Sequence, residues 1–429
     1  MAIDSDLFNR CRVNKNDDGD RFVGVKAEGD NVVVYFPIGY ELPKTEQDLR
    51  QDILHLFSVL AEFTSRDDRI LPMKKFEAPQ SVDFPINAYL EIINYFMEQN
   101  GYYTEKEPKY KTNDRGKIDW PRTIKRQRSL IQANGSPIYT KYTVRVSSPN
   151  DKNLITQIHK YCVYESFSKL GWLFTPYLPE KPLLQRDDKM FLSVLYEKMA
   201  NTYNDRDKRL FSAMISMIEY LDEQPNQKQF YFGTDRFEYV WEKLIDRVFG
   251  IKDKQYYFPR TRWLLRTGKK RINAALEPDT IMLYDGKIYV LDAKYYRFGI
   301  TGDPNDLPES SSINKQITYG EYIYTQQKFK EKYGEDVPVF NAFIMPYNAK
   351  DNLFNSNEIF LNIGEATGDW KTKGHKYERV QGIVVDIHYL MHHYIGKTEN
   401  QIMQLAKSIE SAFERNKGAL PTDSISAVV

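Results

Sequence analysis

The sequence predicts a mixed α/β protein in which an α+β N-terminal domain precedes a mixed sheet flanked by helices. Three observations carry this prediction. An Asp285-Gly286 turn joins two short apolar runs, helical patterns lie on either side of that hairpin, and a second hairpin near the N-terminus is followed by two helices. Strand-like segments interspersed with helices favour a sheet that is covered by helices.

The N-terminal domain is expected to span residues 1–101. Two runs rich in β-branched and aromatic residues, 22–27 and 32–36, predict its hairpin. Apolar residues at helical spacing from about Thr45 to Phe63 predict one helix. Pro85, at a first helical position, begins a second helix that is expected to end near Gly101.

Residues 102–225 are expected to form a separate region that binds DNA or a partner. Residues 102–150 are polar and basic, whereas 154–170 and 187–221 have helical patterns that end at a linker over 222–228. Between Lys106 and Arg145, eleven Lys and Arg residues accompany three acids, so positive charge is concentrated here although the net charge of the chain is only +1. The candidate contacts lie around Trp120 and are Arg122, Lys125 and Arg126. Whether they bind phosphates or an acidic partner surface is left open by the sequence.

The third domain is expected over residues 226–416, with a disordered tail at 417–429. Its elements, in order, are a helix over 234–249, the Asp285-Gly286 hairpin, a helix over 314–333, and strands over 338–345 and 380–387. The connector from Gln255 to Ala275 holds six basic residues and no acid. It predicts DNA or partner contacts by Arg262, Lys269 and Lys270.

The hairpin carries the residues that favour catalysis. Folding 281–284 against 288–291 brings Asp279 beside Asp292 and Lys294, although the two acids are thirteen positions apart. Two carboxylates at one strand end are suitable ligands for Mg2+, and an adjacent lysine would offset charge on a phosphate under attack. The alternative is an ordinary surface hairpin whose acids and lysine are solvated or paired across the strands.

The motif Pro278-Asp279 … Asp292-Ala293-Lys294 resembles the signature of the PD-(D/E)xK nuclease superfamily. The resemblance implies a restriction-endonuclease-like core in which Asp279, Asp292 and the backbone carbonyl of Ala293 bind Mg2+ while Lys294 assists the attacking water. It also implies a glutamate from the preceding helix, for which we choose Glu238 over Glu242, one turn away. In the RecB-like branch a Gln and a Tyr lie beside the metal, and Gln316 and Tyr319 match that placement.

Four further segments are similar to the LlaJI-type restriction endonucleases and to the McrC subunits of nucleotide-dependent restriction systems. They are Phe36-Pro-Ile-Gly-Tyr40, Gly116-Lys-Ile-Asp-Trp120 with Arg122-Thr-Ile-Lys125, Phe237-Glu-Tyr-Val-Trp-Glu242, and Leu291-Asp-Ala-Lys-Tyr295. This resemblance implies a nuclease that cuts double-stranded DNA and is activated by a McrB-like GTPase subunit. The alternatives are a RecB-like repair nuclease that needs free ends and a non-catalytic DNA-binding scaffold.

Composition excludes several other classes. Apolar residues make up 41% and charged residues 28%, there is no apolar run long enough to span a membrane, and the first residues lack a signal-peptide pattern. Only Cys11 and Cys162 are present, which argues against a disulfide framework or a thiolate zinc site. A cytoplasmic protein is therefore expected.

Two other patterns are interpreted as lacking a function of their own. Ile395-Gly-Lys-Thr398 ends like a phosphate-binding loop, but Met391 occupies the position of the first glycine, so nucleotide dependence would have to come from another subunit. His388, His392 and His393 follow one another at helical spacing. Because no cysteine or carboxylate pair is near them in the sequence, they are interpreted as a helix-face cluster rather than a metal site.

Overall fold

The computed structural model describes residues 7–17, 19–28, 31–63, 84–150, 152–175, 177–223, 231–372, 374–396 and 398–415. These residues form two compact units. The first unit contains the described residues between 83 and 228, and the second joins the described N-terminal residues up to 63 to those from 231 onward. The predicted tail and most of the predicted linker lie outside the described residues.

This division differs from the consecutive domains expected from the sequence. The reason is the pairing of β2 (Val23–Glu28) with β9 (Tyr231–Thr234), in which Val23 lies opposite Thr234. The N-terminal strands thereby join the same unit as the C-terminal half. Their sheet has the order β1-β3-β2-β9, with β1 at Cys11–Val13 and β3 at Asn31–Phe36, which confirms the predicted N-terminal hairpin.

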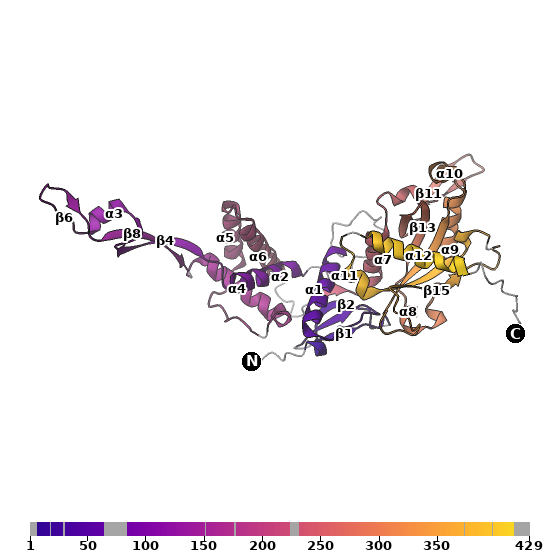
Figure 1. The fold of residues 1–429 in the computed structure, drawn as a ribbon, viewed down its shortest axis with the longest axis horizontal. Coiled ribbons are helices and arrows are strands. Elements are labelled where there is room, and N and C mark those ends of the chain that lie inside the picture. Colours follow the sequence, from indigo (N-terminus) through magenta and orange to yellow (C-terminus); the bar gives the residue numbers. More distant parts are fainter. Residues whose placement is uncertain are drawn as a thin grey trace. The chain divides into compact units, whose positions relative to one another are not determined.

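The first unit combines helices with a long antiparallel ribbon. Its helices are α2 (Ile86–Gln99), α4 (Leu154–Leu170), α5 (Asp188–Asn201) and α6 (Asp205–Glu223), and α2 packs against both α4 and α6. The ribbon pairs β4 (Glu105–Asn113) with β8 (Tyr142–Asn150) along their whole length. Short elements complete it: β5 (Lys117–Ile118), α3 (Trp120–Arg126), β6 (Leu130–Ile131) and β7 (Pro137–Ile138). We call residues 105–150 the arm, which extends away from α2 and α4 (Figure 1).

The second unit is built on a five-stranded mixed sheet of order β12-β13-β14-β16-β15. The strands are β12 (Thr280–Tyr284), β13 (Lys287–Ala293), β14 (Val339–Tyr347), β15 (Phe360–Ala366) and β16 (Val380–Asp386). The pairs β13·β14 and β14·β16 are parallel, whereas β12 and β15 run antiparallel at the two edges. Every residue of β14 is buried, as expected for a strand that helices cover on both faces.

Helices cover both faces of this sheet. On one face, Ile317 and Ile323 of α9 (Ser310–Thr325) share a core with Ile288 and Val290 of β13. On the other, the indole N–H of Trp241 on α7 (Phe237–Phe249) donates to the Ile344 carbonyl at 3.1 Å. Helix α12 (Glu399–Arg415) lies on that second face, where Phe413 contacts Phe340 edge-on. The N-terminal helix α1 (Glu46–Phe63) packs against α7 and against α11 (Ile387–His392).

Two predicted helices are interrupted in the structure. The pattern over 187–221 divides into α5 and α6, and the helix expected over 314–333 divides into α9 and α10 (Gln327–Tyr333) because Gln326 is extended. The arm strands β4 and β8 were not predicted. β4 is polar and shows no alternation, whereas β8 alternates at Tyr142, Val144 and Val146 within a segment whose polar, basic composition favoured loops. Among the described residues, no helix combines the length and apolar character that a membrane span requires.

Candidate active site

The predicted hairpin is present, and its register aligns the two acids. Thr280 pairs with Leu291 and Tyr284 with Lys287, so Asp279 comes opposite Asp292 at the end of the strands. The turn residues Asp285 and Gly286 both have positive φ (49° and 69°), as the tightest hairpin turns require. Aspartate and glycine are among the few residues that accept this backbone conformation, which explains why the sequence signal was reliable.

The Asp279 and Asp292 side chains form a buried acid pair. The Ala293 N–H donates to Asp279 Oδ2 at 2.9 Å, and Lys294 Nζ lies 2.7 Å from Asp292 Oδ2. Asp292 is only 5% exposed. Burial, then the charges of Asp292 and Glu242, together with a hydrogen bond to Asp292, raise the pKa of Asp279 well above its ordinary value. Two buried carboxylates this close favour a bound cation or a shared proton.

Lys294 is held in its charged form at this pair. Burial alone would lower the pKa of its ammonium group, but the Asp292 charge and hydrogen bond and the Asp279 charge outweigh burial and raise it. The Lys294 N–H also donates to the Ile344 carbonyl at 2.8 Å, which continues the β13·β14 pairing beyond Ala293. The lysine therefore stands on a fixed backbone with its charge next to the two acids.

Helix α7 brings Glu242 rather than Glu238 into electrostatic contact with the acids. The Glu242 charge is one of the causes of the raised pKa of Asp279. Burial is the main cause of the raised pKa of Tyr295, and the Glu238 charge contributes to that shift instead. The two glutamates are one turn apart and share a helix face, so the sequence alone could not separate them. The role of either in catalysis stays a prediction.

Helix α9 places Gln316 against β13 and Tyr319 within electrostatic range of the acids. The Gln316 amide donates to the Val290 carbonyl at 2.6 Å, and the residue is 1% exposed. Tyr319 is equally buried, and its hydroxyl has no hydrogen-bond partner among the described residues. Burial and the charges of Asp292 and Asp279 raise the pKa of Tyr319. Gln316 thus anchors the helix to β13, two residues before Asp292, while Tyr319 lies within electrostatic range of both acids.

The segment that begins at Asp279 is held by contacts that the sequence did not reveal. Lys254 Nζ donates to the Asp279 carbonyl at 2.7 Å and lies 2.7 Å from Asp246 Oδ2. The Thr280 hydroxyl donates to Asp246 Oδ1 at 3.1 Å. Asp246 of α7 therefore ties the start of β12 to the helix that carries Glu242. These partners are separated by eight or more positions and follow no periodic pattern.

Comparison with known proteins supplies the family. The profile of the LlaJI restriction endonuclease matches residues 22–364, which is most of the chain. The chain belongs to the LlaJI restriction endonuclease family. It is 27% identical over 355 residues to the type II restriction enzyme BsuMI component YdjA of Bacillus subtilis (strain 168), covering 78% of this chain and 73% of that protein. A chain in a structure of Thermococcus gammatolerans McrB AAA+ hexamers with bound McrC is 15% identical, with a TM-score of 0.36 over 92% of this chain and 83% of that one.

In this LlaJI-family chain the predicted basic contacts are exposed. Arg262, Lys269 and Lys270 lie on the ribbon of β10 (Arg260–Leu264) and β11 (Lys270–Ala275), which directly precedes the hairpin. On the arm, Lys125 and Arg126 occupy the last turn of α3, while Arg122 stacks at 3.6 Å over the Tyr110 ring and pairs with Asp119 at 2.9 Å.

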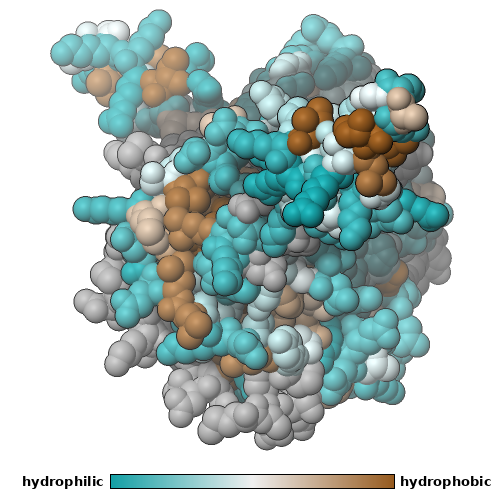
Figure 2. All heavy atoms as spheres, turned by 90° about the vertical axis from the view of Figure 1, so that its left-hand side faces the viewer, coloured by the Kyte–Doolittle hydropathy of each residue, from teal (hydrophilic) through white to brown (hydrophobic). Residues whose placement is uncertain are grey.

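The arm also exposes large apolar side chains. Figure 2 turns toward the viewer the side that carries α3 and β6 in Figure 1, and brown hydrophobic groups stand there among teal hydrophilic ones. Ile124, Leu130 and Ile131 are each more than 60% exposed. A surface that combines exposed apolar and basic side chains is typical of a binding surface rather than of a merely solvated face.

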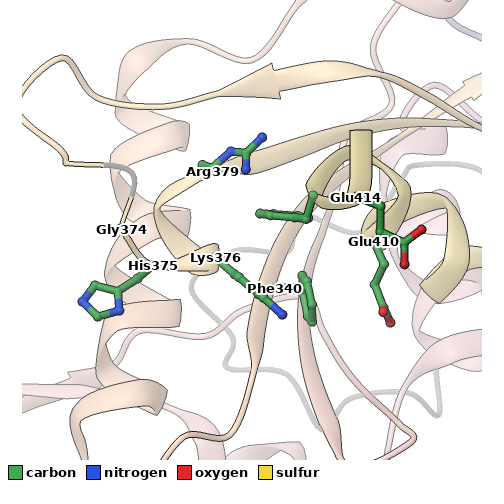
Figure 3. Close-up of a pocket in the computed structure, with 8 residues that line it drawn as sticks. Phe340, Gly374, His375, Lys376, Arg379, Glu410 and Glu414 are labelled. Atoms are coloured by element: carbon green, nitrogen blue, oxygen red, sulfur yellow. The ribbon is translucent and has the colours of Figure 1, made fainter. Parts of the chain in front are cut away.

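A hollow of about 300 Å3 lies at the other end of the strands and is separate from the acids. It is lined by Phe340, Gly374, His375, Lys376, Arg379, Glu410, Phe413 and Glu414. Figure 3 shows Lys376 pointing toward Phe340, whose ring is 4.9 Å from the Lys376 Nζ atom. Glu410 is engaged by Lys287 at 2.8 Å and by the Tyr289 hydroxyl, both near the start of β13. These contacts of Glu410 join α12 to the sheet.

The structure adds one distant carboxylate to the histidine cluster, whose interpretation as a helix-face cluster stays a prediction. This carboxylate is Asp52 of α1, which lies 336 positions from His388 and 340 from His392 in the sequence. His393 lies outside the group, with its ring stacked on Tyr389. Asp52 is so far from these histidines in the sequence that no local pattern indicates the contact.

Proposed function

We propose that this chain is a Mg2+-dependent DNA endonuclease subunit of a phage-defence restriction system, with a PD-(D/E)xK catalytic centre at Asp279, Asp292 and Lys294. The buried acid pair, with the Lys294 ammonium 2.7 Å from Asp292, is the observation that carries the proposal. Family membership supports a restriction nuclease in general, and the acid pair supports the particular chemistry. A solvated surface hairpin would not bury two carboxylates together.

The donor groups at this position fit Mg2+. Asp279 and Asp292 supply carboxylate oxygens, Ala293 would add its carbonyl, and Glu242, in place of Glu238, would add a further carboxylate through water. Burial and the charges of Asp292 and Glu242 raise the pKa of Asp279, and a divalent cation bound here would offset the repulsion between these carboxylates. Bound there, such a cation would polarise the phosphate and lower the pKa of a coordinated water.

The residues of the chain would divide the remaining work. Lys294, held protonated, would face the negative charge on the phosphate oxygens and orient the attacking water. Gln316 would fix β13 beneath the acids through its bond to the Val290 carbonyl. Arg262, Lys269 and Lys270, exposed just before the hairpin, would contact the phosphates of double-stranded DNA and lead it to the acids.

A McrB-like GTPase is the partner we propose for this nuclease. The sequence has no complete nucleotide-binding loop, since Met391 stands where a glycine is required, and Met391 is buried in α11. The relative from Bacillus subtilis is named as one component of a restriction enzyme. An arm with exposed apolar and basic side chains would suit such a subunit contact.

A cleavage assay on two DNA forms tests the proposal. The purified chain is incubated with closed-circular and with linear double-stranded DNA, with Mg2+ or with chelator, and with or without a McrB-like GTPase plus GTP. Mg2+-dependent cutting of the circular DNA, strongest with the partner and GTP, is the expected result. If only the linear DNA is cut, the chain is a RecB-like nuclease that needs free ends. If neither DNA is cut under any condition, the chain is a non-catalytic scaffold. Efficient, site-specific cutting without GTP would refute partner dependence.

Charge reversal on the arm tests its role in binding. The double variant Lys125→Glu/Arg126→Glu is expected to weaken binding to DNA or to the GTPase at least about tenfold and to reduce the salt dependence, because two cations are lost. Arg122 is spared because it stacks on Tyr110 and pairs with Asp119. The matched control is Lys181→Glu/Lys189→Glu, exposed lysines of the same unit outside the arm. Unchanged affinity for both partners, measured by fluorescence anisotropy, would show that the arm charges are only solvated.

A further inference from the structure

We propose that Asp52, His388 and His392 form a Zn2+ site that is distinct from the acid pair. It joins the N-terminal helix α1 to α11, which follows the five-stranded sheet. His388 Nε2 lies 3.2 Å from Asp52 Oδ2, and His392 Nε2 lies 2.9 Å from Asp52 Oδ1. The three ligand atoms lie within 4.8 Å of one another. A tetrahedral zinc site with bonds of about 2.0–2.2 Å needs its ligand atoms somewhat more than 3 Å apart, so these atoms are close to that spacing.

The position of Asp52 is unusual for a carboxylate without a cation. It lies on the buried face of α1, between the apolar residues Leu49 and Ile53, and its side chain is 4% exposed. A buried carboxylate is strongly unfavourable unless its charge is compensated. Each of its two oxygens faces an imidazole nitrogen, and imidazole nitrogens are common ligands of zinc.

The surroundings hold further groups suited to a metal site. His388 and His392 are one turn apart on α11, with their rings stacked 4.5 Å centroid to centroid. His55, one turn after Asp52 on α1, has its ring 4.2 Å from the His392 ring, centroid to centroid. The Tyr40 hydroxyl lies 3.3 Å from His392 Nε2. One carboxylate and two imidazoles leave a fourth position for water or for His55.

The donor set differs in kind from that of the proposed nuclease centre. Nitrogen ligands with one carboxylate select zinc or a similar transition metal, whereas the oxygens of Asp279 and Asp292 suit Mg2+. The site also has a structural purpose. Helix α11 directly follows β16 of the five-stranded sheet, and α1 follows β3 of the four-stranded N-terminal sheet. Helices α1 and α11 lie side by side in Figure 1. A metal held by both would join the N-terminal sheet to the five-stranded sheet.

Metal analysis of the untagged full-length chain tests the site. After dialysis against Zn2+ and removal of loose ions, we expect about one Zn2+ per chain, retained in Asp292→Asn, and a fall of at least about fivefold in Asp52→Asn and His388→Gln/His392→Gln. His393→Gln, whose ring stacks on Tyr389 outside the cluster, is the matched control and should keep its zinc.

Two measurements on the unmutated chain keep the proposal testable if a variant fails to fold. Chelation should lower the melting temperature, and Zn2+ alone should restore it. Co2+ should give the intense visible absorption of a four-coordinate site, whereas an all-oxygen octahedral site gives only a weak band. Absence of bound zinc and of any thermal shift in the unmutated chain would overturn the proposal, as would full zinc content in a folded His388→Gln/His392→Gln variant.

Discussion

The Asp292→Asn variant is expected to lose DNA cleavage by at least about 10³-fold while the chain stays folded. The substitution keeps the shape of the side chain but removes a charge that pairs with Lys294 and acts on Asp279. Metal binding and the placement of the lysine both depend on that charge. Because the same charge raises the pKa of Asp279, its removal should also relieve repulsion in the metal-free protein.

The matched control is Asp285→Asn, in the turn of the same hairpin. Its side chain is 74% exposed, and asparagine accepts the positive φ that this position requires. Cleavage should therefore be unchanged in Asp285→Asn and nearly absent in Asp292→Asn, while melting temperature and DNA affinity stay near those of the unmutated chain in both. Mg2+-dependent cutting by Asp292→Asn at an undiminished rate would remove Asp292 from the proposed site.

The parts of the site that the sequence predicted depend on local geometry. The turn at Asp285-Gly286 allows one register, and that register aligns Asp279 with Asp292 whatever surrounds it. The helix with Gln316 and Tyr319 was likewise found from its own periodicity, and it ended early only because Gln326 is extended. Predictions of this kind need no knowledge of tertiary contacts.

The parts that the sequence did not predict depend on distant contacts. Asp52 meets His388 across 336 positions and His392 across 340, and β2 meets β9 across about half of the chain. β4 has a polar sequence without alternation, so its pairing with β8 is visible only once the two strands are aligned. Such contacts arise when elements pack, and a single sequence has no periodic signal for them.

The choice between Glu238 and Glu242 shows where local reasoning stops. Both lie on one face of α7, so periodicity treats them alike. In the structure, α7 is anchored at Trp241, which donates to the Ile344 carbonyl, and at Asp246, which accepts from the Thr280 hydroxyl. Glu242 lies within that anchored stretch and reaches Asp279 electrostatically, whereas Glu238 lies in the first turn and acts on Tyr295.

The Glu242→Gln variant is accordingly expected to lower Mg2+ affinity or cleavage about 10- to 100-fold, the range for a group that supports metal ligands from outside. Glu238→Gln should cut like the unmutated chain, since its charge acts on Tyr295. Titration of cleavage rate against Mg2+ concentration separates weaker metal binding from a slower chemical step. A defect in Glu238→Gln alone would restore the choice made from the sequence, and equal activity of both variants would mean that the two aspartates and Lys294 suffice.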